Sequence, residues 1–163
     1  MLLEDLRANS WSLRPCCMVT AYRMAHFCSV WRKKSRINNL WAIPVLVLYR
    51  FVTECLFGYE IQAGATIGRR FTIHHGYGVV INKFVVAGDD FTIRHGVTLG
   101  NRGADSLACP VLGNNVELGA GVIVIGDIRI GDNVTIGAGS VVLDNIPDNA
   151  LVVGEKARVK VIK

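Results

Sequence analysis

The feature that most constrains the fold of this chain is a period of six residues. From Leu112 onward the sequence divides into units that each begin with an aliphatic residue: LGNNVE, LGAGVI, VIGDIR, IGDNVT, IGAGSV and VLDNIP. Further units with the same period occupy residues 61–98. A period of six matches neither an amphipathic helix, which repeats at about 3.6 residues, nor an alternating strand, which repeats at about two. It is typical of a coil of short parallel strands, in which each unit forms one flat side.

The repeat also predicts which residues form the core. The first residue of each unit should point inward and stack on its equivalents in the coils above and below. The glycines, asparagines and aspartates fall at the corners, where the backbone needs a left-handed conformation. We therefore predict a mainly β protein, a left-handed parallel β-helix, which is an exception to the usual right-handed crossover. A β-sandwich would instead show alternation at about two and variable turn spacing.

The pattern also divides the chain. We expect a short α-helical N-terminal segment over residues 1–58, the β-helix over 59–147 with an extended loop near 101–111, and a C-terminal tail over 148–163. The N-terminal segment contains no hexads, and its pattern predicts helices over 13–34 and 38–57. The second helix is either weakened at Pro44 or begins there, because proline cannot donate a backbone hydrogen bond.

Composition limits the classes of function. The 163 residues are 51% hydrophobic, so the chain can bury a core without disulfides or metal. A net charge of +5 suits an anionic ligand such as a phosphorylated cofactor, but it is too small and too scattered to indicate nucleic-acid binding. The five cysteines are odd in number and include no C-x-x-C pair, so we expect them to be reduced thiols. Because the N-terminus lacks the pattern of a secretory signal, we expect a cytoplasmic protein.

One segment is apolar enough to need a membrane test. Residues 39–59 are strongly apolar, but the clean apolar run covers only 40–49, and Arg50 and Glu54 then interrupt it. A spanning helix needs about 20 predominantly apolar residues. We therefore expect a buried or interfacial helix, and peripheral contact with the inner face of the cytoplasmic membrane stays open as an alternative.

An insertion in the repeat decides which residues stack. Three hexads give 18 residues to a coil, whereas Ile73 and Ile93 are 20 residues apart. We assign the two extra residues to Val79–Val80, so that Ile93 lies one coil above Ile73. This register places His74 under Arg94, His75 under His95, and Gly76 under Gly96.

A stacked pair of histidines has three interpretations. The first is exposed corner residues without a function. The second is a zinc site, which would need His74, His75 and His95 together with water, but adjacent histidines should point in different directions. The third is general base catalysis, because imidazole titrates near neutral pH and can take a proton from an attacking hydroxyl. We favour the third for His75 and predict no metal.

The hexads and the segments around them resemble the hexapeptide-repeat acyltransferases, and more narrowly their serine acetyltransferase-like branch. The resembling segments are AYRMAHF (21–27), YEIQAGATIGRRFTIHHGYGVVI (59–81), HGVTLGNRG (95–103), IGAGSVV (136–142) and VVGEKARVK (152–160). The resemblance implies transfer of acetyl from acetyl-CoA to a hydroxyl, in a homotrimer whose active sites lie between neighbouring prisms. The chain is also similar to acetyltransferases of bacterial exopolysaccharide biosynthesis.

The resemblance implies roles for particular residues. His75 corresponds to the family's catalytic histidine, and Glu60 to the acid that orients it, which is an aspartate in serine acetyltransferases. His75 would deprotonate the acceptor hydroxyl during direct attack on the thioester, so no acyl-enzyme forms and the cysteines need no role. The pantetheine arm of CoA would contact the backbone of Gly119, Ala120, Gly137, Ala138 and Gly139, and the CoA phosphates would meet Lys156, Arg158 and Lys160. Turn geometry alone for the glycines, and solubility alone for the cations, remain alternatives.

Two departures from serine acetyltransferases concern the acceptor. His74 replaces the aspartate that precedes their catalytic histidine, and Cys109 precedes Pro110 where they have Arg-His-Pro. An acceptor with an ammonium group would lose its carboxylate partner at residue 74, so we expect a neutral polyol such as a sugar. The candidate acceptor contacts are His74, Arg94, His95, Arg102 and Asp105. Serine acetylation, or a non-catalytic trimeric scaffold, is the alternative.

Overall fold

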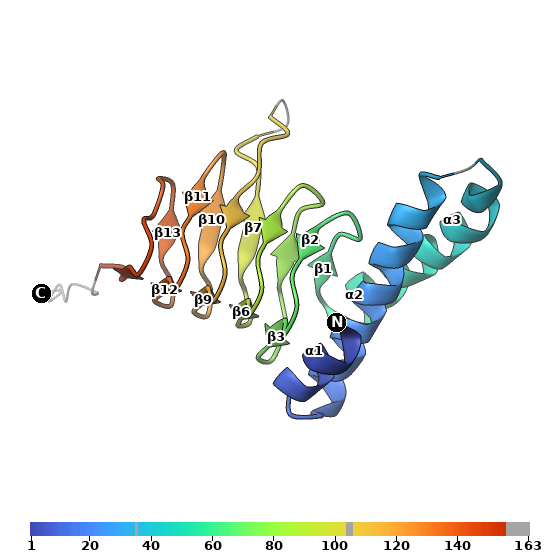
Figure 1. Cartoon of the computed structure of the whole chain (residues 1–163), viewed down its shortest axis with the longest axis horizontal. Coiled ribbons are helices and arrows are strands. Elements are labelled where there is room, and N and C mark those ends of the chain that lie inside the picture. Colours follow the sequence, from blue (N-terminus) through green and yellow to red (C-terminus); the bar gives the residue numbers. More distant parts are fainter. Residues whose placement is uncertain (35, 104–105, 156–163) are drawn as a thin grey trace, which may run out of the picture.

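The fold is the left-handed parallel β-helix that the hexads predict, a three-sided prism with helices at its N-terminal end (Figure 1). The computed structural model describes residues 1–34, 36–103 and 106–155. Sheet A contains β1 (Glu60–Ile61), β4 (Val80–Ile81), β7 (Thr98–Gly100), β10 (Ile123–Ile125) and β13 (Val141–Val142). Sheet B contains β2 (Thr66–Ile67), β5 (Val86–Ala87), β8 (Val111–Leu112) and β11 (Arg129–Ile130). Sheet C contains β3 (Thr72–Ile73), β6 (Thr92–Ile93), β9 (Glu117–Leu118), β12 (Thr135–Ile136) and β14 (Leu151–Val152).

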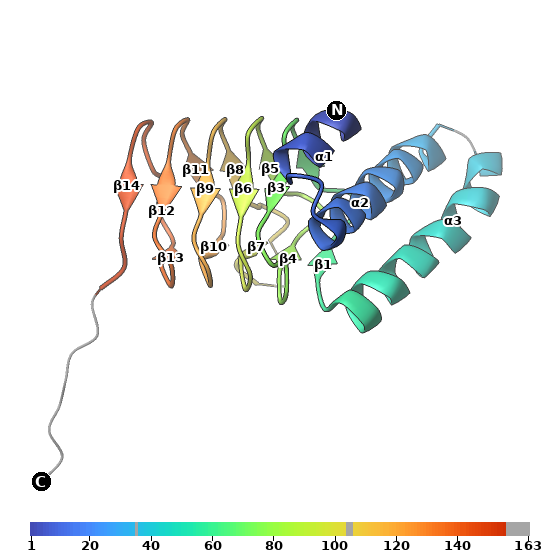
Figure 2. The same cartoon turned by 90° about the horizontal axis from the view of Figure 1, so that it is seen from below.

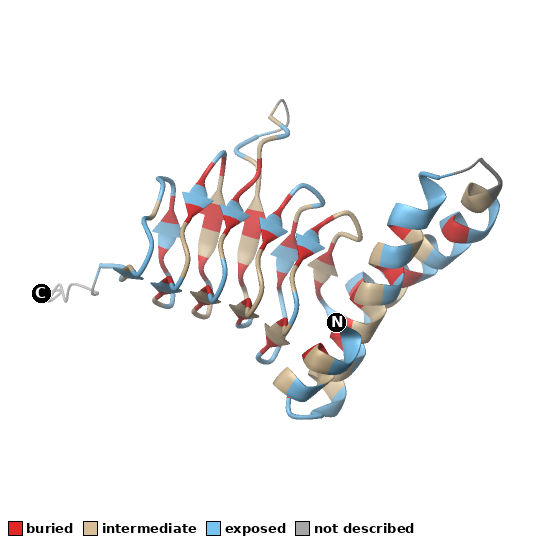
Figure 3. Ribbon diagram, in the orientation of Figure 1, coloured by how far each residue is buried: buried red, intermediate tan, exposed pale blue. Residues whose placement is uncertain are grey.

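The core lies inside the prism, as the repeat predicts. The first residue of each hexad is buried, and the residue before it in each strand faces outward or lies half-buried (Figure 3). Ile73 pairs with Ile93 in the parallel ladder, which confirms the predicted stacking of these coils. Phe71 stacks on Phe91 with ring centroids 5.6 Å apart. Each coil therefore buries its apolar ring on the next, and this repeated burial drives the fold.

The prism extends further than the expected limit at 147. β14 pairs in parallel with β12, so Leu151 and Val152 continue sheet C. Leu151 is exposed and Val152 is half-buried, so the second residue of the strand still faces the prism, although the glycine-rich units have ended. The part of the expected tail that is described, residues 148–155, therefore begins as prism.

The position predicted for the insertion is wrong. Val79 is fully buried and Val80 pairs with Thr98, so both belong to the regular ladder. The extra residues are His75 and Gly76, whose φ values are 69° and 67°. A corner can absorb two residues in the left-handed conformation, whereas residues added within a strand would disturb its inward and outward alternation.

This change of position also alters two predicted neighbours, and the first is that Tyr77, rather than His75, occupies the regular ladder position beneath His95. Gly78, rather than Gly76, lies next to Gly96: a β-carbon added at Gly78 would be 3.7 Å from the Cα of Gly96. The Gly96 N–H donates to the carbonyl of Tyr77 at 2.8 Å. The glycine column of this corner therefore passes through Gly78, and Gly76 lies outside it.

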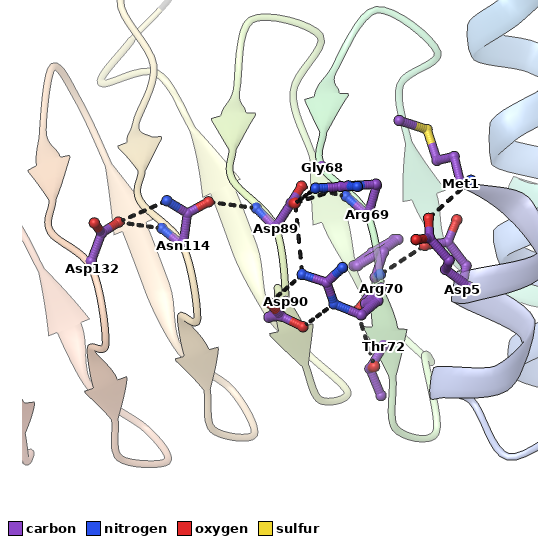
Figure 4. A network of polar contacts seen from close by, with 12 residues as sticks. Met1, Asp5, Gly68, Arg69, Arg70, Thr72, Asp89, Asp90, Asn114 and Asp132 are labelled. Atoms are coloured by element: carbon purple, nitrogen blue, oxygen red, sulfur yellow. Dashed lines mark hydrogen bonds and ion pairs between the residues drawn. The ribbon is translucent and has the colours of Figure 1, made fainter.

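Polar side chains form ladders along another corner. Residues with left-handed φ recur there in successive coils: Arg70, Asp90, Asn115, Asn133 and Asn149. In the neighbouring ladder, the side chain of Asn114 accepts a hydrogen bond from the N–H of Asp89, and Asp132 accepts one from the N–H of Asn114 (Figure 4). This agrees with the predicted use of asparagine and aspartate at corners.

Helices form the N-terminal segment: α1 (Leu2–Ala8), α2 (Leu13–Arg32), α3 (Arg36–Arg50) and a π-helical continuation, η1 (Phe51–Phe57). The two predicted helices are present, and α1 is an addition that the sequence pattern did not reveal. α2 and α3 pack against each other and form a hairpin that extends away from the prism (Figure 2).

The helices close the open end of the prism. The first coil has no coil beneath it, so its backbone groups would lack partners. The side chain of Asp5 accepts the N–H of Phe71 at 2.9 Å, and that of Asn9 accepts the N–H of Ile73 at 3.0 Å. Side chains of the helices also reach carbonyl oxygens of the first coil: Tyr22 to Ala65, Arg23 to Ile67 and Gly68, His26 to Ala63, and Tyr49 to Ile61. The helical segment thus replaces the missing coil.

Candidate active site

The two histidines that the repeat predicts to stack do lie together. The rings of His75 and His95 are inclined at 69°, with centroids 6.0 Å apart. Both side chains are exposed at the corner between sheet C and sheet A. His75 adopts a φ of 69°, which is uncommon for a residue with a β-carbon. The surrounding structure must therefore hold this backbone conformation in place.

Arg14, in the first turns of α2, holds this corner from the outside. Its Nε donates to the carbonyl oxygen of His75 at 3.2 Å, and its Nη1 donates to the Tyr77 hydroxyl at 2.7 Å. Its Nη2 donates to the carbonyl of Phe57 at 2.7 Å. The guanidinium carbon also lies 3.5 Å from the centroid of the Tyr77 ring. One guanidinium therefore joins α2, the end of η1 and the turn that carries His75. Sequence reasoning missed Arg14, because no motif marks it.

Met18, one turn further along α2, packs against the same turn. A β-carbon added at Gly76 would collide with the end of the Met18 side chain, and the φ of 67° at Gly76 disfavours a larger residue in any case. Gly76 is buried, although its neighbours His75 and Tyr77 are exposed. The inserted residues are therefore clamped between α2 and the prism.

Glu60 does not form the predicted contact with His75. Its Oε1 accepts a hydrogen bond from the Nε2 of Gln62 at 2.8 Å, and no hydrogen bond joins it to His75 among the residues that the structure describes. Its backbone N–H donates to the carbonyl of Val79 at 2.7 Å, so Glu60 lies beneath the strand that follows the His75 turn. Its side chain also lines a cavity of about 640 Å³ between the hairpin and the first coil.

The other candidate acceptor contacts are dispersed. His74 is exposed next to His75. Arg94 turns along sheet C and pairs with Glu117, with Nη2 and Oε1 2.9 Å apart. Arg102 follows β7, and its Nη2 lies 3.5 Å from the carbonyl of Leu143, two coils further on. The structure thus brings His75 and His95 together at the corner where the strands of sheet A begin. It leaves Arg102 at the corner where those strands end. Asp105 lies outside the described residues.

The candidate cofactor residues continue the histidine corner. The carbonyl of His95 accepts the N–H of Gly121, and the carbonyl of Ala120 accepts the N–H of Gly139. Ala120 and Ala138 therefore follow His95 along one edge of the prism. A β-carbon at Gly121 or Gly139 would meet none of the described residues within 4 Å, so in this part of the structure the edge is open to a ligand.

Packing between coils explains one of the candidate glycines. A β-carbon at Gly119 would lie 2.5 Å from the backbone N of Ala138, so this glycine is needed for the close approach of two coils. At Gly137 the nearest atom, the Val152 carbonyl oxygen, would be 3.2 Å away. The predicted phosphate contacts Lys156, Arg158 and Lys160 lie outside the described residues.

A metal site does not emerge from the described part of the chain. No group of three or more histidine, cysteine, aspartate or glutamate side chains is placed there to hold a metal ion.

Cys109, in the extended loop, is buried, and burial raises the pKa of its thiol.

Comparisons with known proteins agree with the repeat. Residues 109–144 match the family described as bacterial transferase hexapeptide (six repeats). The chain is 82% identical over 162 residues to the "Putative colanic acid biosynthesis acetyltransferase WcaB" of Escherichia coli K12, covering 99% of this chain and 100% of that protein. It is 50% identical over 112 residues to the serine acetyltransferase of Helicobacter pylori 26695, covering 68% of this chain and 63% of that protein.

Solved structures show the same fold. The serine acetyltransferase of Brucella abortus S19, solved in complex with coenzyme A, superimposes with a TM-score of 0.78 at 28% identity. The match covers 96% of this chain and 65% of that one. The matches thus span roughly two thirds of the length of these two serine acetyltransferases.

The fold and these matches together define an acyl-CoA-dependent acetyltransferase of the hexapeptide-repeat class. Within that class, the chain belongs to the family of the Escherichia coli acetyltransferase that it matches from end to end. The predicted resemblance is confirmed.

Proposed function

We propose that the chain transfers acetyl from acetyl-CoA to a sugar hydroxyl in bacterial exopolysaccharide synthesis, with His75 as the general base. One observation carries the proposal: the His75–His95 pair lies at the start of an open edge that continues through Ala120 and Ala138. The printed description of the Escherichia coli relative, a protein of colanic acid biosynthesis, supports the acceptor class.

The proposed chemistry is a direct transfer. The thioester is placed at the histidine pair by a pantetheine arm that lies along Gly119–Ala120 and Gly137–Gly139. His75 removes the proton from the acceptor hydroxyl as its oxygen attacks the thioester carbonyl. The C–S bond then breaks, and the CoA sulfur takes the proton back from the imidazolium. The product is an acetyl ester and free CoA.

Glu60 is proposed as a positioning residue. It lies beneath the strand that follows the turn of His75, and its bond to Gln62 uses only one carboxylate oxygen. A carboxylate that turns from Gln62 to His75 would fix the imidazole tautomer and stabilise the imidazolium. We therefore expect Glu60→Gln to lower kcat and leave the KM for acetyl-CoA unchanged.

A homotrimer would complete the site. The outer surface of the prism carries exposed apolar side chains, namely Val80, Phe84, Val86, Val111 and Val141. Burying them between prisms would be favourable. We propose that it would also bring the extended loop of one chain to the histidine corner of another, so that Arg102 could reach an acceptor there. We propose this assembly for a cytoplasmic enzyme and keep Lys156, Arg158 and Lys160 as its phosphate contacts.

The test is thiol release from acetyl-CoA with fucose- and galactose-containing acceptors and with serine. The variant of choice is His75→Asn, because asparagine tolerates the left-handed φ that His75 adopts. We expect turnover with a sugar and a loss of about 10²–10⁴-fold in kcat for the variant, with CoA binding retained. His95→Gln is the companion variant at the same corner, and a smaller loss of kcat than in His75→Asn would distinguish the base from its neighbour.

Each other outcome has a defined meaning. Unchanged turnover in His75→Asn would refute the base assignment. Turnover with serine and none with sugars would favour a serine acetyltransferase and remove the significance of His74. CoA binding without turnover on any of these acceptors would favour the scaffold.

A further inference from the structure

The outer face of α3 and η1 is an apolar surface on which none of the described residues packs. The stretch Asn38–Phe57 is long and apolar enough to cross a membrane, with a mean hydropathy of 1.6, yet only 17% of it is buried. We name the α3 apolar face by six side chains that are each at least 59% exposed: Leu40, Trp41, Val47, Leu48, Phe51 and Leu56. A soluble monomer rarely exposes so many large apolar side chains together.

The opposite side of this helix is fixed to the rest of the chain. Ala42, Tyr49 and Thr53 are buried at helical spacing, and α3 packs on α2. The Tyr49 hydroxyl donates to the carbonyl of Ile61 in β1 at 2.6 Å. The helix therefore cannot leave the protein to span a bilayer without breaking these contacts. It can present one apolar side to a surface and keep the other side on the protein.

Two charges lie on this stretch, and they neutralise each other. Arg50 Nε and Glu54 Oε1 are 2.8 Å apart, one helical turn from each other. All other residues from Asn38 to Phe57 are uncharged. A paired charge costs less than a lone charge when it approaches a medium of low dielectric constant.

Positive charge gathers at the end of the hairpin. Arg32, Lys33 and Lys34 are exposed at the end of α2, next to the start of α3, and Trp31 there is 37% exposed. The whole stretch of residues 6–53 contains no aspartate or glutamate. A second copy of this surface would bring the same positive charge, and the acidic residue on it, Glu54, is already paired with Arg50. A surface of negative phosphates would complement it.

We propose that the α3 apolar face docks in the plane of an anionic lipid bilayer. The apolar side chains enter the boundary between headgroups and acyl chains, and Arg32, Lys33 and Lys34 contact the lipid phosphates. Trp31 and Trp41 have the amphipathic rings that favour the headgroup level.

The test is co-sedimentation of the full chain with phosphatidylcholine vesicles that contain or lack phosphatidylglycerol. We expect binding to the anionic vesicles that weakens as salt is raised. The double variant Trp41→Glu/Leu48→Glu should lower the binding constant by about tenfold or more, because it places charge in the apolar layer. Leu3→Glu, at a side chain of similar exposure on α1, is the matched control and should bind like the wild type. The triple variant Arg32→Gln/Lys33→Gln/Lys34→Gln should lose the preference for anionic lipid.

Three results would overturn the proposal. The first is absence of wild-type binding to either vesicle, and the second is equal binding by the wild type and the double variant. The third is that the wild type does not bind vesicles but self-associates without lipid, as measured by light scattering, and that the double variant does not self-associate. That result would assign the face to a second copy of the chain. Circular dichroism of each variant shows that a loss of binding is not a loss of fold.

Discussion

Replacement of Asp5 by alanine tests whether the N-terminal helix closes the prism. Asp5 is fully buried, and its Oδ2 lies 2.8 Å from the Nε of Arg23, which is itself only 9% exposed. The other carboxylate oxygen accepts the N–H of Phe71 at the edge of sheet C. Asp5→Ala would leave Arg23 as a buried charge without its counter-ion and Phe71 with an unpaired N–H.

The expected loss of stability is large. Removing one partner of a buried ion pair costs about 3–5 kcal/mol, mainly because the remaining charge stays desolvated. In a chain of this size about 1 kcal/mol changes Tm by about 2–4 °C, so Asp5→Ala should lower Tm by about 6–20 °C. Asp5→Asn keeps an acceptor for Phe71 and loses the charge, so its effect should be smaller.

Thermal unfolding followed by circular dichroism, at one protein concentration, measures this difference. Glu4→Ala is the control: Glu4 lies next to Asp5, and its partner is the exposed amino terminus at 3.0 Å. An exposed pair of this kind contributes about 0–1 kcal/mol. A Tm for Asp5→Ala within about 2 °C of the control would show that α1 does not stabilise the end of the prism.

Three further predictions concern the corner, acid stability and metal. Arg14→Lys keeps the positive charge but loses the guanidinium fork, so kcat should fall by roughly 10–100-fold at unchanged KM for acetyl-CoA, and an unchanged kcat would contradict its positioning role. The hydrogen bond from Arg70 lowers the pKa of Asp90, so this carboxylate stabilises the fold above its unfolded pKa and that contribution is lost as pH falls through its lower folded pKa. Asp90→Asn should therefore be less stable than the wild type at neutral pH in urea unfolding, with a difference that disappears in acid. A chelator should leave acetyl transfer unaltered, and loss of activity would return attention to His74, His75 and His95 as metal ligands.

The sequence predicted the prism and the corner that carries the site because both depend on a period. Equivalent residues in a β-helix stack, so the spacing of Ile73 and Ile93 was enough to place His74–His75 and Arg94–His95 at the same corner of neighbouring coils. The ring contact itself depends on the inserted turn, because Tyr77 occupies the regular position beneath His95. A shift of one residue would have turned the aliphatic ring outward, and for this reason the register is strongly specified.

The position of the insertion could not be derived from the same count. Extra residues at Val79–Val80 or at His75–Gly76 both leave Ile73 beneath Ile93. Only the backbone conformation, with left-handed φ at His75 and Gly76, distinguishes the two arrangements. Valine is enriched in strands, and the prediction that Val79–Val80 were the inserted residues did not take this preference into account.

The closing helix and Arg14 were missed for a different reason. α1 has seven residues, too few to show a helical period. The bond from Asn9 to Ile73 joins residues 64 positions apart, and that from Arg14 to Tyr77 joins residues 63 apart. Contacts of this range have no local signal in a single sequence.

The insertion changes how the helical segment should be regarded. At the regular positions of this corner, Ala120 and Ala138, the backbone simply passes from one sheet to the next and leaves an open edge. At the first coil, two residues are inserted at this corner, and one of them is His75. Its backbone adopts a left-handed conformation that its own β-carbon disfavours. Arg14 and Met18 of α2 hold the turn in place. The prism alone therefore supplies the edge along which we place the donor, and the N-terminal segment fixes the proposed base at the end of it.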